Sequence, residues 1–160
     1  MKSSNSARMW PVASLLAACV SATCCKGSPT APGHAPPPPP DKGSVHVSIH
    51  PNPVPYSGVP VTDTSECEKL PHTWYYDQVF VETGGTNVTF NARIDTFDGF
   101  VVNNFTGLDI QVQARGTLTL HARWCSANPI NHVAQSTFSG VDGRGQTVNV
   151  TTAQIHLQAK

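Results

Sequence analysis

The sequence predicts an all-β fold in which two antiparallel sheets pack face to face. Apolar and polar residues alternate with a period of two through most of residues 44–160, as they do in half-buried strands. Turn signals containing Gly, Asn or Asp separate these runs, and no window keeps a 3.6-residue period over the length of a helix. About seven short strands of this kind are typical of a sandwich. A small closed barrel is the alternative, which periodicity does not distinguish from a sandwich.

The expected strands follow one another with mostly short connections, except for the long segment of residues 52–70 after the first strand. The first covers residues 45–50 and ends before Pro51 and Pro53. Asp98 and Gly99 are typical of a type I′ hairpin turn, and residues 142–145 supply the turn of the last hairpin. The later strands are expected at residues 74–83, 88–94, 100–105, 117–124, 133–141 and 147–157.

The same alternation predicts the core. In residues 88–94, the apolar side chains from Val88 to Ile94 occupy every second position and are expected to face inward together. The predicted core residues of the whole domain are Val47, Ile49, Phe90, Ile94, Leu118, Leu120, Trp124, Phe138, Val150, Ile155 and Leu157.

The order of these elements, with a tight turn between the last two strands, resembles an immunoglobulin-like or fibronectin type III-like module of bacterial surface proteins. The resemblance covers residues 44–160 and rests on the strand pattern rather than on an invariant motif. It implies an antiparallel two-sheet sandwich with Greek-key connections. It implies no activity, because sandwiches of this type carry many unrelated functions.

Residues 1–18 have the pattern of a bacterial lipoprotein signal peptide. Lys2 and Arg8 precede an apolar run, residues 9–18, that is about half as long as a membrane-spanning helix. This run ends in Leu-Ala-Ala directly before Cys19, which resembles a lipobox. The resemblance implies cleavage before Cys19 and attachment of palmitate-type acyl chains to it, so that the mature protein is anchored to a membrane. An ordinary signal peptide cut elsewhere is the alternative.

Residues 19–43 are predicted to be a disordered, Pro-rich linker. They contain almost no apolar side chain to bury, and residues 36–40 are consecutive prolines that favour an extended polyproline II helix. Such a stalk would hold the domain of residues 44–160 away from the lipid. A docking motif for an SH3-like or WW-like domain is the alternative interpretation.

The five cysteines become an even number once Cys19 is assigned to lipid. Cys67 and Cys125 are the two cysteines of the predicted domain, and an exported compartment favours their oxidation. We therefore expect a disulfide Cys67–Cys125 near one end of the sandwich, worth about 3–4 kcal/mol in the chain-entropy description. Two free thiols are the alternative. The sequence does not assign the adjacent Cys24 and Cys25.

Composition and spacing argue against nucleic-acid, metal and cofactor sites. The formal net charge is zero and charged residues make up 12% of the chain, without a basic stripe. His46 and His50 share one face of a strand but lie about 13 Å apart, too far to bind one metal ion together. No nucleophile elbow is present. We therefore expect no cofactor, no metal, no nucleic-acid partner and no catalytic residue.

Two groups of residues remain as candidate sites. Trp74, Tyr75 and Tyr76 are consecutive, so they cannot all point inward in a strand, and an exposed ring could stack on a sugar or anchor a protein partner. Alternatively, residues 52–70 cover the outer ring. Asp95 and Asp98 are paired carboxylates that a small hydrolase could use, although turn chemistry alone also selects Asp before Gly.

These features together predict a monomeric, non-catalytic lipoprotein of the bacterial cell envelope that acts as a binding or structural module. Its expected location is lipid-anchored at the outer membrane, facing the periplasm or the cell surface. Its partners would be the membrane, through the lipid, and an unidentified protein or glycan. Carbohydrate binding through Trp74, Tyr75 or Tyr76 and hydrolysis through Asp95 and Asp98 are the alternatives.

Overall fold

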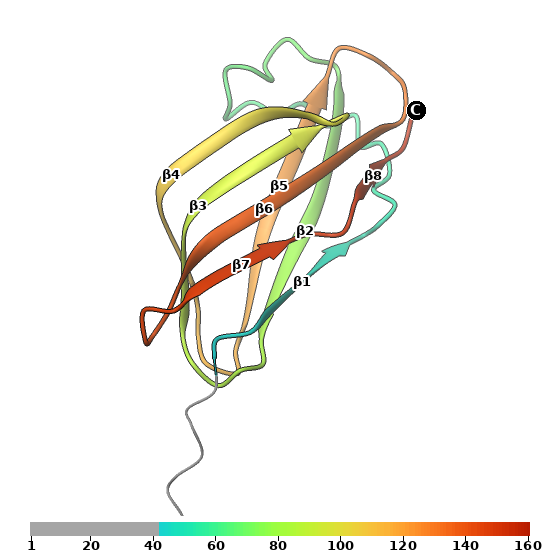
Figure 1. The fold of residues 1–160 in the computed structure, drawn as a ribbon. Coiled ribbons are helices and arrows are strands. Elements are labelled where there is room, and N and C mark those ends of the chain that lie inside the picture. The colour runs from blue at the N-terminus through green and yellow to red at the C-terminus, as the bar shows by residue number, and fades with distance from the viewer. Residues whose placement is uncertain (1–41) are drawn as a thin grey trace, which may run out of the picture. The chain divides into compact units, whose positions relative to one another are not determined.

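The computed structural model of the chain describes residues 42–160, which form two antiparallel sheets packed as a sandwich (Figure 1). One sheet has the strand order β1-β2-β5, and the other has the order β4-β3-β6-β7 with β8 also paired to β6. This arrangement confirms the predicted fold class. The strands are β1 (Val45–His50), β2 (His72–Glu82), β3 (Val88–Phe97), β4 (Phe100–Val112), β5 (Thr117–Ser126), β6 (His132–Asp142), β7 (Thr147–Thr151) and β8 (Ile155–Leu157).

The expected signal peptide, the lipidated Cys19 and nearly all of the expected linker lie outside the described residues. Within residues 42–160, no helix is both long and apolar enough to cross a bilayer. The description therefore concerns the sandwich domain alone.

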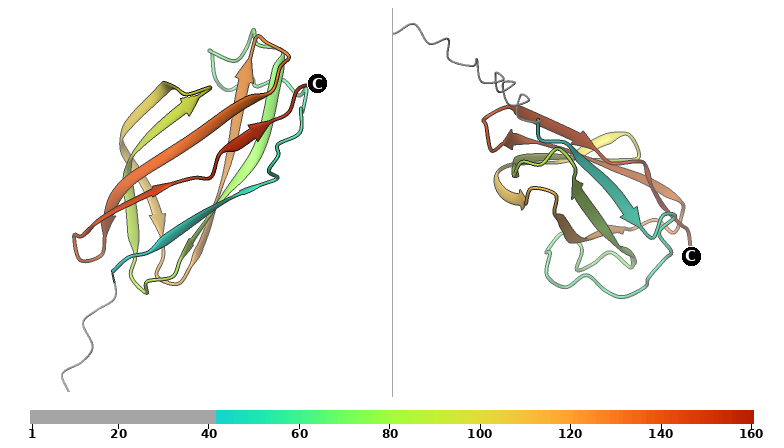
Figure 2. Two further views of the ribbon diagram at one scale, coloured as in Figure 1. Left: turned by 45° about the vertical axis from the view of Figure 1, so that its right-hand side comes forward. Right: turned by 90° about the horizontal axis from the view of Figure 1, so that it is seen from below.

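The chain passes from one sheet to the other after β2, β4 and β5, as in a Greek-key sandwich. The fourth strand pairs with β3, whereas the constant-type immunoglobulin fold places its fourth strand beside the fifth. As a result β4 and β5 are both edge strands, one in each sheet. Figures 1 and 2 show that β4 and β5 diverge from their short connection toward the end of the sandwich covered by the loop between β1 and β2.

Two apolar clusters fill most of the space between the sheets. The first is centred on Phe80, Phe90 and Phe138, which are fully buried and have ring centroids 4.9–5.9 Å apart. The second includes Trp74 and Ile155, which are also fully buried. Of the predicted core, Val47, Ile49, Phe90, Phe138, Ile155 and Leu157 are buried, whereas Leu118, Leu120, Trp124 and Val150 are half-buried.

Ile94 was expected in the core, and this prediction is wrong: its side chain is 41% exposed. The pairing of β3 with both β4 and β6 shifts register between Phe90 and Ala92, so Asn91 forms a β-bulge. One extra residue exchanges the two faces of a strand. Beyond the bulge, Ile94 therefore lies on the outer face and Asp95 on the inner face.

Several strand boundaries also differ from the predicted ones, most clearly those of β4 and of the last predicted strand. β4 continues beyond residue 105 because the chain passes through the irregularity opposite the bulge, where Gly107 has a φ of 71°. The last predicted strand divides into β7 and β8 around Thr152, whose hydroxyl accepts a hydrogen bond from the Ser136 amide (3.1 Å).

Candidate functional site

A layer of polar side chains crosses the interior of the sandwich between the two apolar clusters. Its members, here called the polar layer, are Gln78 on β2, Arg93 and Asp95 on β3, Asn103 on β4 and Ser136 on β6. Gln78 is 1% exposed, and Asp95 and Ser136 are each 2% exposed. Buried polar groups are costly unless they find partners, so the bonding within this layer defines its chemistry.

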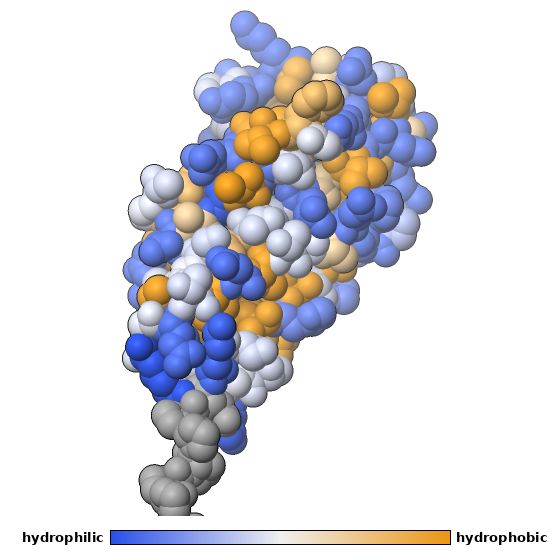
Figure 3. All heavy atoms as spheres, viewed as in Figure 1, coloured by the Kyte–Doolittle hydropathy of each residue, from blue (hydrophilic) through white to orange (hydrophobic). Residues whose placement is uncertain are grey.

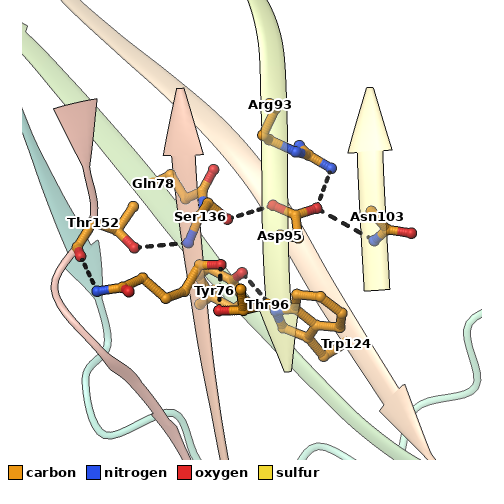
Figure 4. Close-up of polar contacts among 10 residues, drawn as sticks. Tyr76, Gln78, Arg93, Asp95, Thr96, Asn103, Trp124, Ser136 and Thr152 are labelled. Atoms are coloured by element: carbon orange, nitrogen blue, oxygen red, sulfur yellow. Dashed lines mark hydrogen bonds and ion pairs between the residues drawn. The ribbon is translucent and has the colours of Figure 1, made fainter. Parts of the chain in front are cut away.

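Asp95 is the centre of this bonding (Figure 4). Its Oδ1 accepts a hydrogen bond from the Ser136 hydroxyl (2.7 Å), and its Oδ2 accepts one from the Asn103 amide (3.3 Å). The Arg93 guanidinium forms an ion pair with the same Oδ2 at 3.0 Å. The carboxylate is thus neutralised and held by three side chains from three strands.

Beside the polar layer, an open cavity of about 830 Å³ lies between the sheets on the side of the edge strands β4 and β5. Every member of the polar layer lines this inter-sheet cavity, together with apolar residues of β3, β4 and β5. Two polar atoms of the lining, Gln78 Oε1 and Arg93 Nε, are buried and have no hydrogen-bond partner. Such atoms in a cavity wall are unusual and mark a place where a bound molecule could complete the bonding.

Aromatic side chains form one wall of the cavity. The Trp124 indole N–H donates a hydrogen bond to the Tyr76 hydroxyl (2.9 Å), and the Trp124 ring lies 5.1 Å from that of Phe97, centroid to centroid. Burial raises the pKa of the Tyr76 phenol well above its ordinary value, although the hydrogen bond from Trp124 opposes the shift. Tyr76 therefore stays protonated and able to donate at any physiological pH.

The predicted disulfide Cys67–Cys125 is present, with the two Cα atoms 5.7 Å apart. It ties the loop between β1 and β2 to the end of β5, and both cysteines belong to the rim of the inter-sheet cavity. Arg123 strengthens the same connection through an ion pair with Asp63 (2.7 Å) and a hydrogen bond to Thr64 (3.0 Å). The disulfide therefore fixes the loop that borders the cavity.

The structure does not bring Trp74, Tyr75 and Tyr76 to one surface. Trp74 is fully buried and donates its indole N–H to the Gln158 carbonyl (2.8 Å), and Tyr76 is 5% exposed. Tyr75 points outward, is 38% exposed, and donates its hydroxyl to the carbonyl of Pro60 (3.1 Å) in the β1–β2 loop. Of the three, Tyr76 is the one that lines the cavity.

Asp95 and Asp98 are also separated in their roles. Asp98 lies in the β3–β4 turn with a φ of 50°, next to Gly99 with a φ of 84°, as a type I′ turn requires. Its carboxylate accepts from the Val133 amide (2.9 Å) and contacts His132 Nδ1 (2.7 Å). Burial would raise the pKa of Asp98, but these two partners outweigh it and lower the pKa.

Sequence reasoning missed the polar layer because it carried the alternation from Phe90 straight through to Ile94. A signal was nevertheless present, since Phe90 and Phe97 are separated by an odd number of positions. Two large aromatic residues at odd spacing cannot share the inner face of a regular strand, so their spacing indicates a bulge between them. Counting back from Phe97 would have placed Asp95 and Arg93 inside.

Other features of the described residues are weaker candidates. No group of three His, Cys, Asp or Glu side chains in residues 42–160 is arranged to bind a metal ion. A second hollow, of about 560 Å³, is lined partly by His132, whose two ring nitrogens both have partners. Exposed apolar side chains form separate patches among polar ones on the face seen in Figure 3. The inter-sheet cavity is therefore the candidate site.

Comparison with solved structures finds the same fold in proteins of low sequence identity, among them the following two. A protein from Bordetella pertussis described as ApaA has a TM-score of 0.56 and 17% identity, covering 76% of this chain and 98% of that chain. Structural-genomics target SoR45 has a TM-score of 0.53 and 12% identity, covering 74% and 87% of the two chains. The likeness concerns the fold alone. No protein-family model and no curated protein sequence matches this chain.

Proposed function

We propose that this protein is a non-catalytic binding module of the bacterial cell envelope and that the inter-sheet cavity is its ligand site. The cavity, of about 830 Å³, is the observation that carries the proposal. Sandwich interiors are normally filled by interdigitating apolar side chains. A pocket of this size, with apolar walls and a few buried polar groups, has the properties of a small-molecule site.

Two features support a binding role rather than catalysis. Ser136, Asn103 and Arg93 engage both oxygens of Asp95, so this carboxylate already has three partners within the protein. Asp98 is engaged in its own turn by Val133 and His132. A pair of carboxylates acting on one substrate would need to face a common site.

The envelope location is part of the proposal and rests on the lipobox and on the disulfide, because disulfides persist in oxidising, extracytoplasmic compartments. We expect the mature chain to begin at an acylated Cys19. Mass spectrometry of the N-terminus of membrane-extracted protein tests this expectation, and Cys19→Ser should release the protein from the membrane fraction. An unmodified N-terminus at another residue would remove the anchor from the proposal.

The cavity can be tested by filling it. Ala122 lines the cavity on β5, whereas Thr119 is exposed on the same strand, so Ala122→Phe and Thr119→Phe form a matched pair. A library of small polar compounds should contain members that raise the melting temperature of the full-length wild type and of Thr119→Phe but not of Ala122→Phe. Equal responses of the two variants would contradict the cavity as the binding site.

A further inference from the structure

The hydrogen-bonding directions in the polar layer specify the chemistry of the molecule that the cavity accepts. Resting on the proposed function of this cavity, we infer that its ligand is a neutral, polyhydroxylated ring, either a monosaccharide or the terminal sugar of a glycan. The inference combines three properties of the wall: unpaired hydrogen-bonding groups of both kinds, balanced charge, and an aromatic surface.

The acceptor is the side-chain oxygen of Gln78. The Ser136 hydroxyl donates its one proton to Asp95 (2.7 Å), so toward Gln78 (3.4 Å) it can only accept. The Gln78 amide nitrogen must therefore face Ser136. This fixes the orientation of the amide and leaves Gln78 Oε1 as a buried acceptor without a donor.

Two donors belong to the same cavity wall. Arg93 Nε–H is buried and has no acceptor. The Tyr76 oxygen accepts from Trp124, and its own proton has no acceptor among residues 42–160. A ligand that satisfies this wall must both donate and accept, which each hydroxyl group of a sugar does.

The charges of the cavity favour a neutral ligand. Arg93 is balanced by Asp95 at 3.0 Å, and at the rim Arg123 is balanced by Asp63 at 2.7 Å. The exposed Glu66 also belongs to the rim, which adds negative rather than positive charge. An anionic ligand would therefore meet carboxylates without an uncompensated cation to bind it.

The apolar part of the wall fits the flat C–H face of a sugar ring. Trp124 and Phe97 lie next to each other at 5.1 Å, and Phe105 carries the Arg93 guanidinium 4.7 Å above its ring. The hydrogen bond from the Trp124 N–H to Tyr76 fixes the orientation of the indole. Because Trp124 is only half-buried, part of its ring remains exposed and available to a ligand.

The test is ligand-observed NMR and titration calorimetry on the full chain in detergent. The probes are glucose, galactose, mannose and N-acetylglucosamine, with glucuronate and glucose 6-phosphate as charged analogues. At least one neutral sugar should bind, and the charged analogues should bind at least about tenfold more weakly. Gln78→Met removes the unpaired acceptor at similar size and should weaken sugar binding about tenfold.

Two further variants complete the test. Trp124→Phe keeps an aromatic ring but loses the indole N–H, and it should weaken sugar binding several-fold. It serves in place of Gln78→Met if Gln78→Met fails to fold. Tyr75→Ala is the matched control, because Tyr75 lies on the outer face and should leave binding unchanged.

Each contrary result has a distinct meaning. Sugar binding that Gln78→Met leaves unchanged and Tyr75→Ala abolishes would overturn the inference by moving the site to the outer face. Absence of binding by all four neutral sugars, or preferential binding of the charged analogues, would also overturn it. If another compound then binds and Ala122→Phe abolishes its binding, the cavity stands as the ligand site. If Ala122→Phe changes the binding of no compound, the proposed function fails as well.

Discussion

Around the first apolar cluster the space between the sheets is closed, whereas at the polar layer, beside the edge strands β4 and β5, it is open. The closed half is the cluster around Phe80, Phe90 and Phe138, all fully buried and in mutual ring contact. The open half consists of the polar layer and the inter-sheet cavity, with Phe97, Phe105 and Trp124 only partly covered. Both halves use the same strands, yet they differ in what their side chains can contribute.

The difference indicates that the closed half of the strands provides most of the stability, whereas the open half provides the proposed binding site. Burial of aromatic side chains in a closely packed core stabilises the fold by several kcal/mol per residue. The ion pair Arg93–Asp95, in which the carboxylate is buried and the guanidinium is half-buried, contributes little, because the cost of removing charge from water offsets the attraction. If both halves contributed equally to stability, side chains would fill the inter-sheet cavity as they fill the closed half.

The largest expected effect is in the closed half. Phe138→Ala removes a fully buried ring that touches both Phe80 and Phe90, so it should lower the free energy of unfolding by about 3–5 kcal/mol. Phe105→Ala in the open half, where the ring is 39% exposed, should cost less than about 1 kcal/mol. Chemical denaturation measures the free energy of unfolding of both variants. Equal losses would contradict the difference between the closed and open halves.

The bulge that divides the two halves predicts the next effect. Gly140 on β6 lies opposite Phe90, and a Cβ at this position would overlap the Thr89 carbonyl oxygen and approach the Phe90 Cα to 2.6 Å. Gly140→Ala should therefore cost about 2–3 kcal/mol. Gly145→Ala, at an open turn position with a φ of 77°, should cost only about 1 kcal/mol. Equal losses in the two variants would show that β3 and β6 do not approach so closely.

The bulge also explains what the sequence could and could not predict. Period-two alternation depends on local backbone geometry, so it located β1 to β6, merged β7 and β8 into one strand, and gave the face of residues such as Val47 and Phe138. Cys67 and Cys125 were paired because no other cysteines lie in the domain. The position of the polar layer depends on a single inserted residue, Asn91, which reverses the inner and outer faces of β3 from there to its end. The sequence around Asn91 gives little sign of this bulge.

The three consecutive aromatic residues illustrate a second reason. Alternation required that Tyr75 face opposite to Trp74 and Tyr76, but it fitted either choice of inner face. The choice depends on contacts distant in sequence, since Trp74 donates to Gln158 and Tyr75 donates to Pro60. Such long-range contacts are properties of the assembled sheets, which no local pattern contains.

A third prediction concerns how the end of the closed half is held. Glu82 accepts hydrogen bonds from the backbone amides of Ser44, Gly84, Gly85 and Arg115 at 2.7–3.2 Å. Burial would raise the pKa of Glu82, but these four donors outweigh it and lower the pKa. A lowered pKa gives stability that is present above the unfolded-state pKa, near 4, and is lost as the pH falls through the folded-state pKa.

Glu82→Gln leaves some of these amides without an acceptor and should cost about 2 kcal/mol at pH 7. The difference between wild type and variant should shrink as the pH is lowered below about 4, since the wild-type carboxylate becomes protonated. Urea denaturation from pH 7 to pH 3 measures both effects. A difference that stays constant over this range would contradict the role of the charged carboxylate.

The smallest expected effect on stability is in the polar layer. The triple variant Arg93→Met, Asp95→Leu and Ser136→Ala replaces the ion pair and its bonded hydroxyl by apolar groups. Because desolvation of the pair is no longer needed, the free energy of unfolding should stay within about 1 kcal/mol of wild type, while ligand binding in the cavity is lost. Asp95→Leu alone should cost about 2–3 kcal/mol, since it leaves Arg93 without its partner. If the triple variant loses as much as Phe138→Ala, the polar layer holds the two sheets together, and the open half is structural after all.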